Sequence, residues 1–501
     1  MDSIWQQALD PWEWLVLVHL LFWLAISARV LLRSDLSPDV RVAWLLVLLL
    51  LPYGGVLLYF LFGEVYLGRA LARQQKAVLK NLRLAVRAHH DWRSLWQPAV
   101  SSESAPQPWQ AATSYAHSVN GFALTHGNLA QLLPEADARA CLLRDIDAAT
   151  QHIHLLYYIW LPDATGSALA QALARAAQRG VACRVLVDAL GSRLLLASPL
   201  WTQMQAAGVQ TAVALPFHWW QPLRSGRFDV RNHRKVCVID GRISHVGSQN
   251  CADAAFAIKA KYAPWVDIML RVEGAVVAQN QLLFISDWLL ATGQSLDALA
   301  HTVQLPSAEL GTELGTELAQ VAAQVVAAGP ASRPRSTAQF LVTLLSSAQR
   351  QLWISTPYFV PDATVLQALC AAAWRGVDVR LILPARNDSW VVAAASRSHY
   401  ASLLAAGVQI FEYTEGLLHA KTLTLDGQLS LIGSTNIDMR SFGLNYENNV
   451  LLQDRQLAAA IMQRQREYCA LAQVVQASQV QSWGRLQRIW NNAWAALSPL
   501  L

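Results

Sequence analysis

The stretch His-Arg-Lys-Val-Cys-Val-Ile-Asp-Gly at residues 233–241 returns as His-Ala-Lys-Thr-Leu-Thr-Leu-Asp-Gly at residues 419–427. In both copies Gly-Ser-x-Asn follows at the same distance, at residues 247–250 and 433–436. Six shared positions, each matched by chance about one time in twenty, give odds of about 10⁻⁸ at any starting point. The chain therefore contains two related halves.

Each copy predicts a β-hairpin with polar side chains on one face. Side chains two residues apart in a strand share a face, so each histidine and the lysine after it are expected to point together. The apolar, β-rich residues that follow end at Asp-Gly, a strong signal for a tight hairpin turn. The return strand then brings Gly-Ser-x-Asn beside the histidine.

The two copies together predict a cationic pocket for one phosphodiester. A neutral histidine can attack phosphorus, and the opposite histidine can protonate the departing alkoxide and later accept a proton from the incoming alcohol. Lysines stabilise the charge on the non-bridging oxygens. The candidate catalytic residues are His233, Lys235, Asp240, His419, Lys421 and Asp426. The candidate phosphate-binding residues are Ser248, Asn250, Ser434 and Asn436, which carry hydrogen-bond donors.

This chemistry needs no cofactor and no metal, and the sequence contains no Cys-x-x-Cys pair that would indicate a metal site. Six cysteines at irregular spacing are expected to be small buried residues rather than a disulfide framework.

The paired motifs resemble the phospholipase D superfamily, whose HxKxxxxD signature occurs twice in its two-lobed members. Residues 231–235, 356–362 and 436–441 are similar to segments of bacterial cardiolipin synthases, and the resemblance covers nearly the whole chain. It implies an α/β fold: two α/β/α lobes with mixed sheets, related by a pseudo-twofold axis. It also implies transfer of a phosphatidyl group from one phosphatidylglycerol to the terminal glycerol hydroxyl of another, with release of glycerol.

Within this reaction we expect His233 to be the nucleophile, through a covalent phosphohistidine, and His419 to be the general acid and base, although the two roles are interchangeable by sequence. The resemblance further implies an acidic residue that orients each histidine. Glu447, 28 residues after His419 (447 − 419), and Asp267, 34 residues after His233 (267 − 233), fit this role, with Asp253 as a competitor for the second. Asp240 and Asp426 are expected to brace the hairpins rather than carry protons.

Two other functions share this site. A phospholipase D-type hydrolase would give the phosphatidyl group to water, and a membrane-tethered nuclease would act on another phosphodiester. A catalytically inactive scaffold for anionic lipid is disfavoured because both motifs are intact.

Uncharged stretches at the start of the chain predict a membrane anchor. Residues 42–62 contain no charge and are long enough to span a bilayer, and residues 14–28 reach spanning length if the helix continues to residue 32. Six basic residues at 3- and 4-residue spacing follow, from Arg69 to Arg87, and are expected to form a helix on anionic lipid. They outnumber the three arginines between the spans, which predicts a cytoplasmic catalytic domain.

The predicted organisation has six parts. They are a membrane anchor at 1–66 with two transmembrane helices (about 12–32 and 42–62), a basic juxtamembrane helix and linker at 67–112, a first lobe at 113–305, an inter-lobe connection at 306–335, a second lobe at 336–480, and an amphipathic tail at 481–501 expected at the membrane interface. The expected partners are phosphatidylglycerol, other anionic phospholipids and the bilayer, with no nucleic acid. The expected location is the bacterial inner membrane, as a multi-pass protein.

Overall fold

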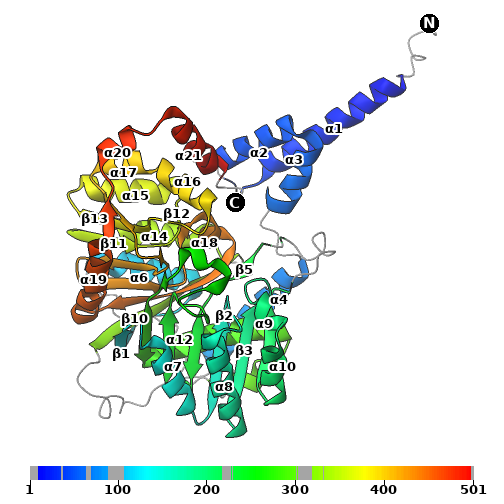
Figure 1. Cartoon of the computed structure of the whole chain (residues 1–501). Helices are drawn as coiled ribbons and strands as arrows, with labels where there is room; N and C mark the ends of the chain where they lie inside the picture. The colour runs from blue at the N-terminus through cyan, green and yellow to red at the C-terminus, as the bar shows by residue number, and fades with distance from the viewer. Residues whose placement is uncertain are drawn as a thin grey trace. The chain divides into compact units, whose positions relative to one another are not determined.

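The structure, a computed structural model, describes residues 10–34, 36, 38–63, 69–88, 107–216, 227, 229–300, 302, 319–330 and 332–497. The chain divides into two compact units (Figure 1). One unit, here called the anchor, comprises residues 1–68 and 219–228, and the other, the body, holds nearly all remaining residues.

The anchor contains the helices α1 (Pro11–Leu32), α2 (Pro38–Leu50) and α3 (Pro52–Leu58), and α3 continues as one π-helical turn, Tyr59–Gly63. Among the described residues, α1 alone is long and apolar enough to cross a membrane. The prediction of one helix over 42–62 is wrong, because the chain breaks at Leu51. Pro52 lacks an N–H and its ring fits only the first turn of a new helix, so α3 starts there and packs back on α2.

The body begins with two helices and continues into the first half of the repeat. Its elements are α4 (Arg69–Ala88), α6 (Gln107–Asn120), β1 (Thr125–Leu133), α7 (Ala138–Asp147), β2 (His152–Tyr157), α8 (Ala164–Gln178), β3 (Ala182–Asp188), α9 (Arg193–Leu196), α10 (Pro199–Ala206), β4 (Gln210–Ala214), β5 (Arg231–Asn232), β6 (Val236–Ile239), β7 (Ile243–Gly247), a 3-10 helix (Ala257–Tyr262), β8 (Trp265–Val266), β9 (Met269–Glu273), α12 (Ala275–Thr292) and α13 (Asp297–Ala300).

The second half repeats this order. Its elements are β10 (Ala319–Ala328), α14 (Ser336–Ser346), β11 (Gln351–Ser355), β12 (Phe359–Val360), α15 (Ala363–Trp374), β13 (Asp378–Pro384), α16 (Trp390–Ser398), α17 (Tyr400–Ala406), β14 (Gln409–Tyr413), β15 (Leu417–Leu418), β16 (Thr422–Leu425), β17 (Leu429–Gly433), β18 (Ile437–Asp438), α18 (Met439–Gly443), β19 (Asn445–Gln453), α19 (Arg455–Ala470), β20 (Ala472–Val474), α20 (Ala477–Gln481) and α21 (Arg485–Leu497).

The two halves share one 16-stranded sheet, with strand order β20-β14-β13-β11-β16-β17-β19-β10-β1-β9-β7-β6-β2-β3-β4 and β5 attached to β19. The antiparallel pair β1–β10 lies at its centre, and corresponding strands of the two halves follow in mirrored order on either side. In each half the outer strands are parallel and the inner strands antiparallel, except that the edge strand β20 pairs antiparallel with β14. The prediction of two α/β halves with mixed sheets is confirmed. The structure further shows that the two sheets join into one, which was not predicted.

Two segments belong to different parts of the body than their sequence positions suggested. Residues 319–328, assigned to the connection, form the strand β10 next to the centre of the sheet. Helix α6, assigned partly to the linker and partly to the first lobe, buries Trp109, Ala112 and Ala116 in the core of the second half. The first half's core is built instead around the buried helix α12.

The two amphipathic helices both pack on the body. On α4, Leu82 is buried in the core and Val78 and Ala85 pack against it, while the basic residues Arg73, Lys76 and Lys80 are exposed. At the other end of the chain α21 lies along α16 (Figure 1), and the Trp390 and Trp490 rings stack with centroids 5.6 Å apart. Apolar side chains of both helices thus pack against the rest of the body. The contacts with lipid that the sequence predicts for both helices remain predictions.

The motif hairpins β6–β7 and β16–β17 each turn at the predicted Asp-Gly, where both residues adopt positive φ. The aspartates also tie each hairpin to a neighbouring strand. Asp240 accepts the backbone N–H groups of residues 150–152, just before and at the start of β2, at 2.8 Å. Asp426 accepts those of residues 349–351 at 2.7 to 3.3 Å. These hydrogen bonds fasten each hairpin turn to the start of a neighbouring strand, which is the bracing contact that the sequence predicts.

Replacement of Asp426 by asparagine is expected to lower the free energy of unfolding by about 2–3 kcal/mol, because hydrogen bonds to a charged acceptor are the strong ones. Asp147→Asn, which breaks one exposed ion pair with Arg175, is the matched control and is expected to cost less than about 1 kcal/mol. Denaturant unfolding in mild detergent measures both. An unchanged stability with complete loss of turnover in Asp426→Asn would contradict a bracing role.

Candidate active site

The two motif histidines are positioned by short strands exchanged between the halves. His233 follows β5, which pairs in parallel with the start of β19 in the second half. His419 follows β15, which pairs in parallel with β8 in the first half. The exchange continues through the histidine backbones, since His233 N–H donates to Tyr446 O at 3.0 Å and His419 N–H to Val266 O at 2.8 Å.

This exchange places each histidine against a carboxylate of the other half. Glu447, the residue after Tyr446, lies with its two carboxylate oxygens 3.1 and 3.0 Å from His233 Nδ1. Asp267, the residue after Val266, has Oδ1 2.6 Å from His419 Nδ1. Glu447 and Asp267 thus both contact a motif histidine, but the pairing within each half that their spacing suggested is wrong. The strand exchange is the reason.

The competing carboxylate, Asp253, lies elsewhere. It accepts hydrogen bonds from the backbone N–H groups of Ala164 and Thr165 at 3.2 and 2.9 Å, at the start of α8. It therefore secures a helix start rather than an imidazole.

Both carboxylates fix the tautomer of their histidine. An ionised carboxylate only accepts hydrogen bonds, so Nδ1 of each ring must carry the proton that it shares with Glu447 or Asp267. Nε2 is then the atom with the free lone pair, as an attacking nitrogen requires. Aromatic rings hold the imidazoles from the side, with Tyr158 4.8 Å from His233 and Trp265 4.7 Å from His419 between centroids.

Burial keeps both rings neutral in the empty site. Desolvation lowers the pKa of His233 and of His419 to about 4, and Lys235 and Lys421 add to the effect, while the carboxylates oppose it. For Asp267, burial raises the pKa, but His419 and Lys421 outweigh burial and bring it to about 2. At neutral pH each pair is therefore a carboxylate facing an uncharged imidazole.

The two lysines are buried beneath the histidines. Lys235 Nζ donates to His233 O at 2.8 Å and Lys421 Nζ donates to His419 O at 2.7 Å. Desolvation lowers the pKa of Lys235 to about 8 and that of Lys421 to about 7, even though Glu447 and Asp267 lie nearby and raise both. Charge on these ammonium groups is costly until an anion arrives, which suits them to bind a phosphodiester.

The serines of Gly-Ser-x-Asn have a different role from the one expected. Ser434 Oγ donates to Glu447 Oε2, and Ser248 Oγ donates to Asp267 Oδ1 at 2.6 Å. Each hydroxyl donates its proton to the carboxylate that contacts a histidine, so this proton is not available to a phosphate oxygen. The prediction that they bind phosphate directly is not supported by these contacts.

The asparagines retain free polar groups. Asn250 Oδ1 accepts Ile159 N–H at 3.3 Å, and its amide nitrogen has no partner among the described residues. Asn436 is 3% exposed, and its Oδ1 is likewise without a partner in the described part of the chain. Both side chains sit in the loops that follow β7 and β17, where their amide N–H groups, but not the acceptor Oδ1 of Asn436, can donate to a phosphate oxygen.

Sequence reasoning missed Tyr158 and Trp265, which contact the histidine rings, and Asn448, whose Oδ1 accepts Lys235 N–H at 3.2 Å. The tripeptide Glu447-Asn448-Asn449, polar within a buried strand, was the available signal for the last of these.

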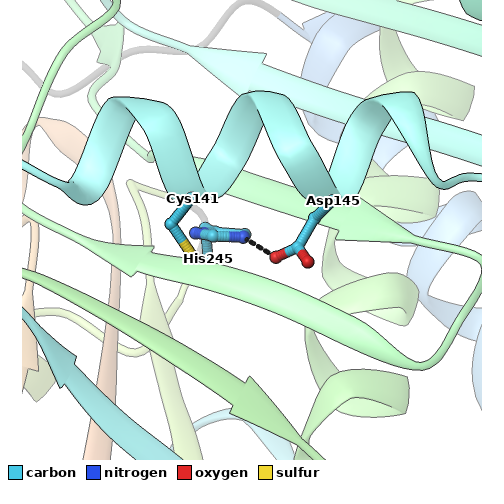
Figure 2. Close-up of side chains that lie close together, drawn as sticks. All are labelled: Cys141, Asp145 and His245. Atoms are coloured by element: carbon cyan, nitrogen blue, oxygen red, sulfur yellow. Dashed lines mark hydrogen bonds and ion pairs between the residues drawn. The ribbon is translucent and has the colours of Figure 1, made fainter.

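A separate cluster of Cys141, Asp145 and His245 lies between α7 and β7 (Figure 2). His245 Nε2 is 2.7 Å from Asp145 Oδ2, and Arg271 Nε donates to the same oxygen at 2.8 Å. The guanidinium already neutralises the carboxylate, so this donor set acts as a clamp between a helix and two strands rather than as a metal centre.

Comparison with known proteins places this geometry in a family. The family model described as cardiolipin synthase, PLD-like domain, matches residues 142–286 and 341–468, and one described as phospholipase D-nuclease N-terminal matches residues 20–64. Cardiolipin synthase A of Pectobacterium carotovorum is 35% identical over 96% of this chain and 97% of its own length, and that of Pectobacterium atrosepticum is 35% identical over 98% of each.

Among solved structures, phosphatidylserine synthase of Haemophilus influenzae aligns with a TM-score of 0.56 at 16% identity, over 78% of this chain and 100% of that one. A likeness at this identity shows a shared fold alone. The match of both halves, with relatives 35% identical along nearly the whole chain, shows that this protein belongs to the cardiolipin synthase family of phospholipase D-like proteins.

Proposed function

We propose that the protein is a cardiolipin synthase, a phosphatidyltransferase that moves a phosphatidyl group from one phosphatidylglycerol to another and releases glycerol. The observation that carries this proposal is the pair of buried imidazole–carboxylate contacts that cross between the halves, with one buried lysine beside each. Relatives of the cardiolipin synthase A type over almost the full length support the choice of substrate.

In the first step His233 Nε2 attacks the phosphorus of one phosphatidylglycerol, and the bond from phosphorus to the headgroup glycerol oxygen breaks. His419 delivers a proton to that oxygen, so glycerol leaves neutral and a phosphatidyl–His233 intermediate remains. In the second step the terminal hydroxyl of another phosphatidylglycerol gives its proton to His419 and attacks phosphorus, which releases His233 and forms cardiolipin.

The hydrogen-bond lengths support this division of roles. The contact of His419 with Asp267 is 2.6 Å, against 3.0 and 3.1 Å between His233 and Glu447. A short charge-assisted bond favours the imidazolium form, which the proton donor requires. The phosphodiester brings a negative charge that raises the pKa of His419, and this charge supplies the protonated form that the empty site disfavours.

Lys235, Lys421, Asn250 and Asn436 would bind the non-bridging phosphate oxygens, and Ser248 and Ser434 would keep the carboxylates in place. Because the lysines are buried, their charge acts at low dielectric and stabilises the transition state more than exposed lysines would.

Membrane association follows from the apolar helix α1 and from the family. We infer that the membrane is the bacterial inner membrane, that the catalytic body lies on the cytoplasmic side, and that phosphatidylglycerol and other anionic phospholipids reach the site from the bilayer. The basic residues that follow the anchor favour the cytoplasmic side by the positive-inside rule.

Product analysis of the purified protein with headgroup-labelled phosphatidylglycerol in mixed micelles tests the proposal. Cardiolipin and glycerol in equal amounts are expected. His233→Ala and His419→Ala are each expected to lose at least 10³-fold in turnover, because one phosphate needs both halves. His126→Ala, on the exposed part of β1, is the matched control and should retain wild-type turnover.

Phosphatidic acid with glycerol as the sole products would make the protein a hydrolase with the same site. Activity on DNA without activity on lipid would make it a nuclease. Substantial turnover in either single histidine variant would contradict the shared site.

The pH dependence of kcat/KM, which reports the free enzyme, is expected to rise above about pH 4 and to fall above about pH 7. The acid limb reflects His233, which must be neutral to attack phosphorus, and the alkaline limb reflects the loss of the proton from Lys421. Unfolding does not explain the alkaline limb: the unfolded chain binds more protons at these lysines above pH 7, so their contribution to stability rises with pH. A kcat/KM constant to pH 10 would contradict the assignment.

A further inference from the structure

The anchor contains a contact that a pair of membrane-spanning helices cannot make. Arg33, directly after α1, donates from Nη1 to the carbonyl oxygen of Gly63, at the end of the π-helical turn, at 2.9 Å. Arg41, in the first turn of α2, donates from Nη2 to Arg33 O at 2.6 Å. The end of α1, the start of α2 and the end of the π-helical turn therefore lie together, whereas the two ends of a spanning segment over 42–62 would be about 30 Å apart.

Further contacts place α2 and α3 alongside α1 as a hairpin. Ile26 and Val30 of α1 pack in one cluster with Trp44 and Leu48 of α2 and with Tyr59. Near the hairpin tip, His19 Nδ1 lies 2.9 Å from the Tyr53 hydroxyl. His19 in α1 and Arg33 directly after it are 14 residues apart (33 − 19), about 21 Å of helix, so the hairpin reaches about two-thirds of the way along a 30 Å hydrocarbon core.

Each arm of the hairpin is too short to cross a bilayer. Helix α2 has 13 residues, about 20 Å, and α3 with the π-helical turn has 12 (7 + 5), about 18 Å. The arms approach closely because Gly55 faces α2, where an added Cβ would lie 2.6 Å from Val47 O, while at the neighbouring Gly54 an added Cβ would make only an ordinary contact, 3.9 Å from Leu51 Cβ.

The outer surface of the hairpin is apolar and unprotected in the described chain. Its exposed large side chains include Leu46, Leu49, Leu50, Leu51, Tyr53, Leu57 and Phe60. Part of the turn at the tip is satisfied within the protein, since Leu51 N–H donates to Val47 O and Gly55 N–H to Leu51 O, and Pro52 has no N–H. This surface is continuous with the exposed apolar side chains of α1, such as Leu17, Val18 and Leu21.

We propose that α2 and α3 form a re-entrant hairpin that enters the lipid bilayer and returns to the side it came from, so that α1 is the one segment of the anchor that crosses the membrane. The partner of this surface is the acyl-chain region of one leaflet. A short apolar segment of 10–14 residues is more typical of such a hairpin than of a span.

The distribution of charge fits this topology. With a re-entrant hairpin, Arg29, Arg33 and Arg41 lie on the same side of the membrane as the basic residues of α4, from Arg69 onward. Residues 1–13 on the opposite side contain no lysine or arginine and carry Asp2, Asp10 and Glu13. All basic residues that flank the anchor then obey the positive-inside rule, whereas two spans would place three arginines on the wrong side.

Arg227, which precedes the first motif, contacts the same end of the hairpin. Arg227 donates from Nη1 to Phe62 O and its guanidinium lies 6.0 Å from the Phe62 ring centroid. This contact, within the anchor unit, places the chain that leads into the first motif on the side of the membrane where the hairpin ends.

Cysteine labelling of the full-length protein in the membrane tests the topology. Single variants Asp10→Cys before α1, Ser34→Cys after α1, Leu51→Cys at the hairpin tip and Gln463→Cys on exposed α19 are treated with a membrane-impermeant maleimide, in spheroplasts and in inside-out vesicles. The wild-type protein, whose six cysteines are buried or half-buried, gives the background. An unfolding transition in mild detergent like that of the wild-type protein shows that each variant is folded.

Ser34→Cys and Gln463→Cys are expected to react from one and the same side, Asp10→Cys from the other, and Leu51→Cys from neither. Reaction of Ser34→Cys and Gln463→Cys from opposite sides would establish two spans and overturn the proposal. A nitroxide attached at position 51 provides a second readout, because a tip within the acyl chains is more accessible to oxygen than to a water-soluble nickel chelate. The reverse order of accessibility would also overturn the proposal.

The labelling pattern does not depend on the identity of the product. An enzyme that forms cardiolipin but lacks the predicted labelling pattern would overturn the hairpin and leave the proposed function intact. A protein that shows the predicted pattern but forms no cardiolipin would overturn the proposed function and leave the hairpin intact.

Discussion

The exchange of short strands between the halves is the constraint on which the site depends. β5 of the first half pairs with β19 of the second, and β15 of the second pairs with β8 of the first. Each pairing brings a histidine backbone onto the residue before the opposite carboxylate, so neither imidazole is oriented without the other half. The continuous sheet through β1 and β10 keeps the two halves in the register that this exchange requires.

Burial gives the site its electrostatic character. Two lysines and two histidines with depressed pKa values, and two carboxylates as their counter-charges, form a set that is close to neutral until a phosphodiester enters. In the proposed mechanism, the negative charge of the bound phosphodiester raises these pKa values again, so that His419 and the lysines hold their protons. Binding and activation are thereby coupled, because the same charge that holds the substrate prepares the proton donor.

Much of this could be predicted from the sequence, because the informative residues are local. The histidine, lysine and aspartate of each motif, the Asp-Gly turns and the Gly-Ser-x-Asn loops lie within 18 residues (250 − 233 + 1), so strand alternation and turn chemistry place them correctly. The carboxylate partner of each histidine could not be assigned, because the number of residues between them does not show which half of the protein the histidine packs against. The contacts of the serine hydroxyls were missed for a different reason: their carboxylate acceptors lie in the same half but 19 and 13 residues further along the chain, outside the motif. The single helix expected over residues 42–62 was wrong because of one residue, Pro52, which ends α2 and starts α3, and the sequence does not show that α3 packs back on α2.

The crossed pairing itself is tested most directly by the imidazole ¹⁵N resonances of His233 and His419, assigned by difference with the alanine variants. In Glu447→Gln the account predicts that His233 loses its Nδ1–H tautomer preference and that the resonances of His419 stay nearly unchanged. Asp267→Asn is predicted to do the reverse. A response of His419 to Glu447→Gln, with His233 unaffected, would show that each half orients its own histidine and would contradict the account.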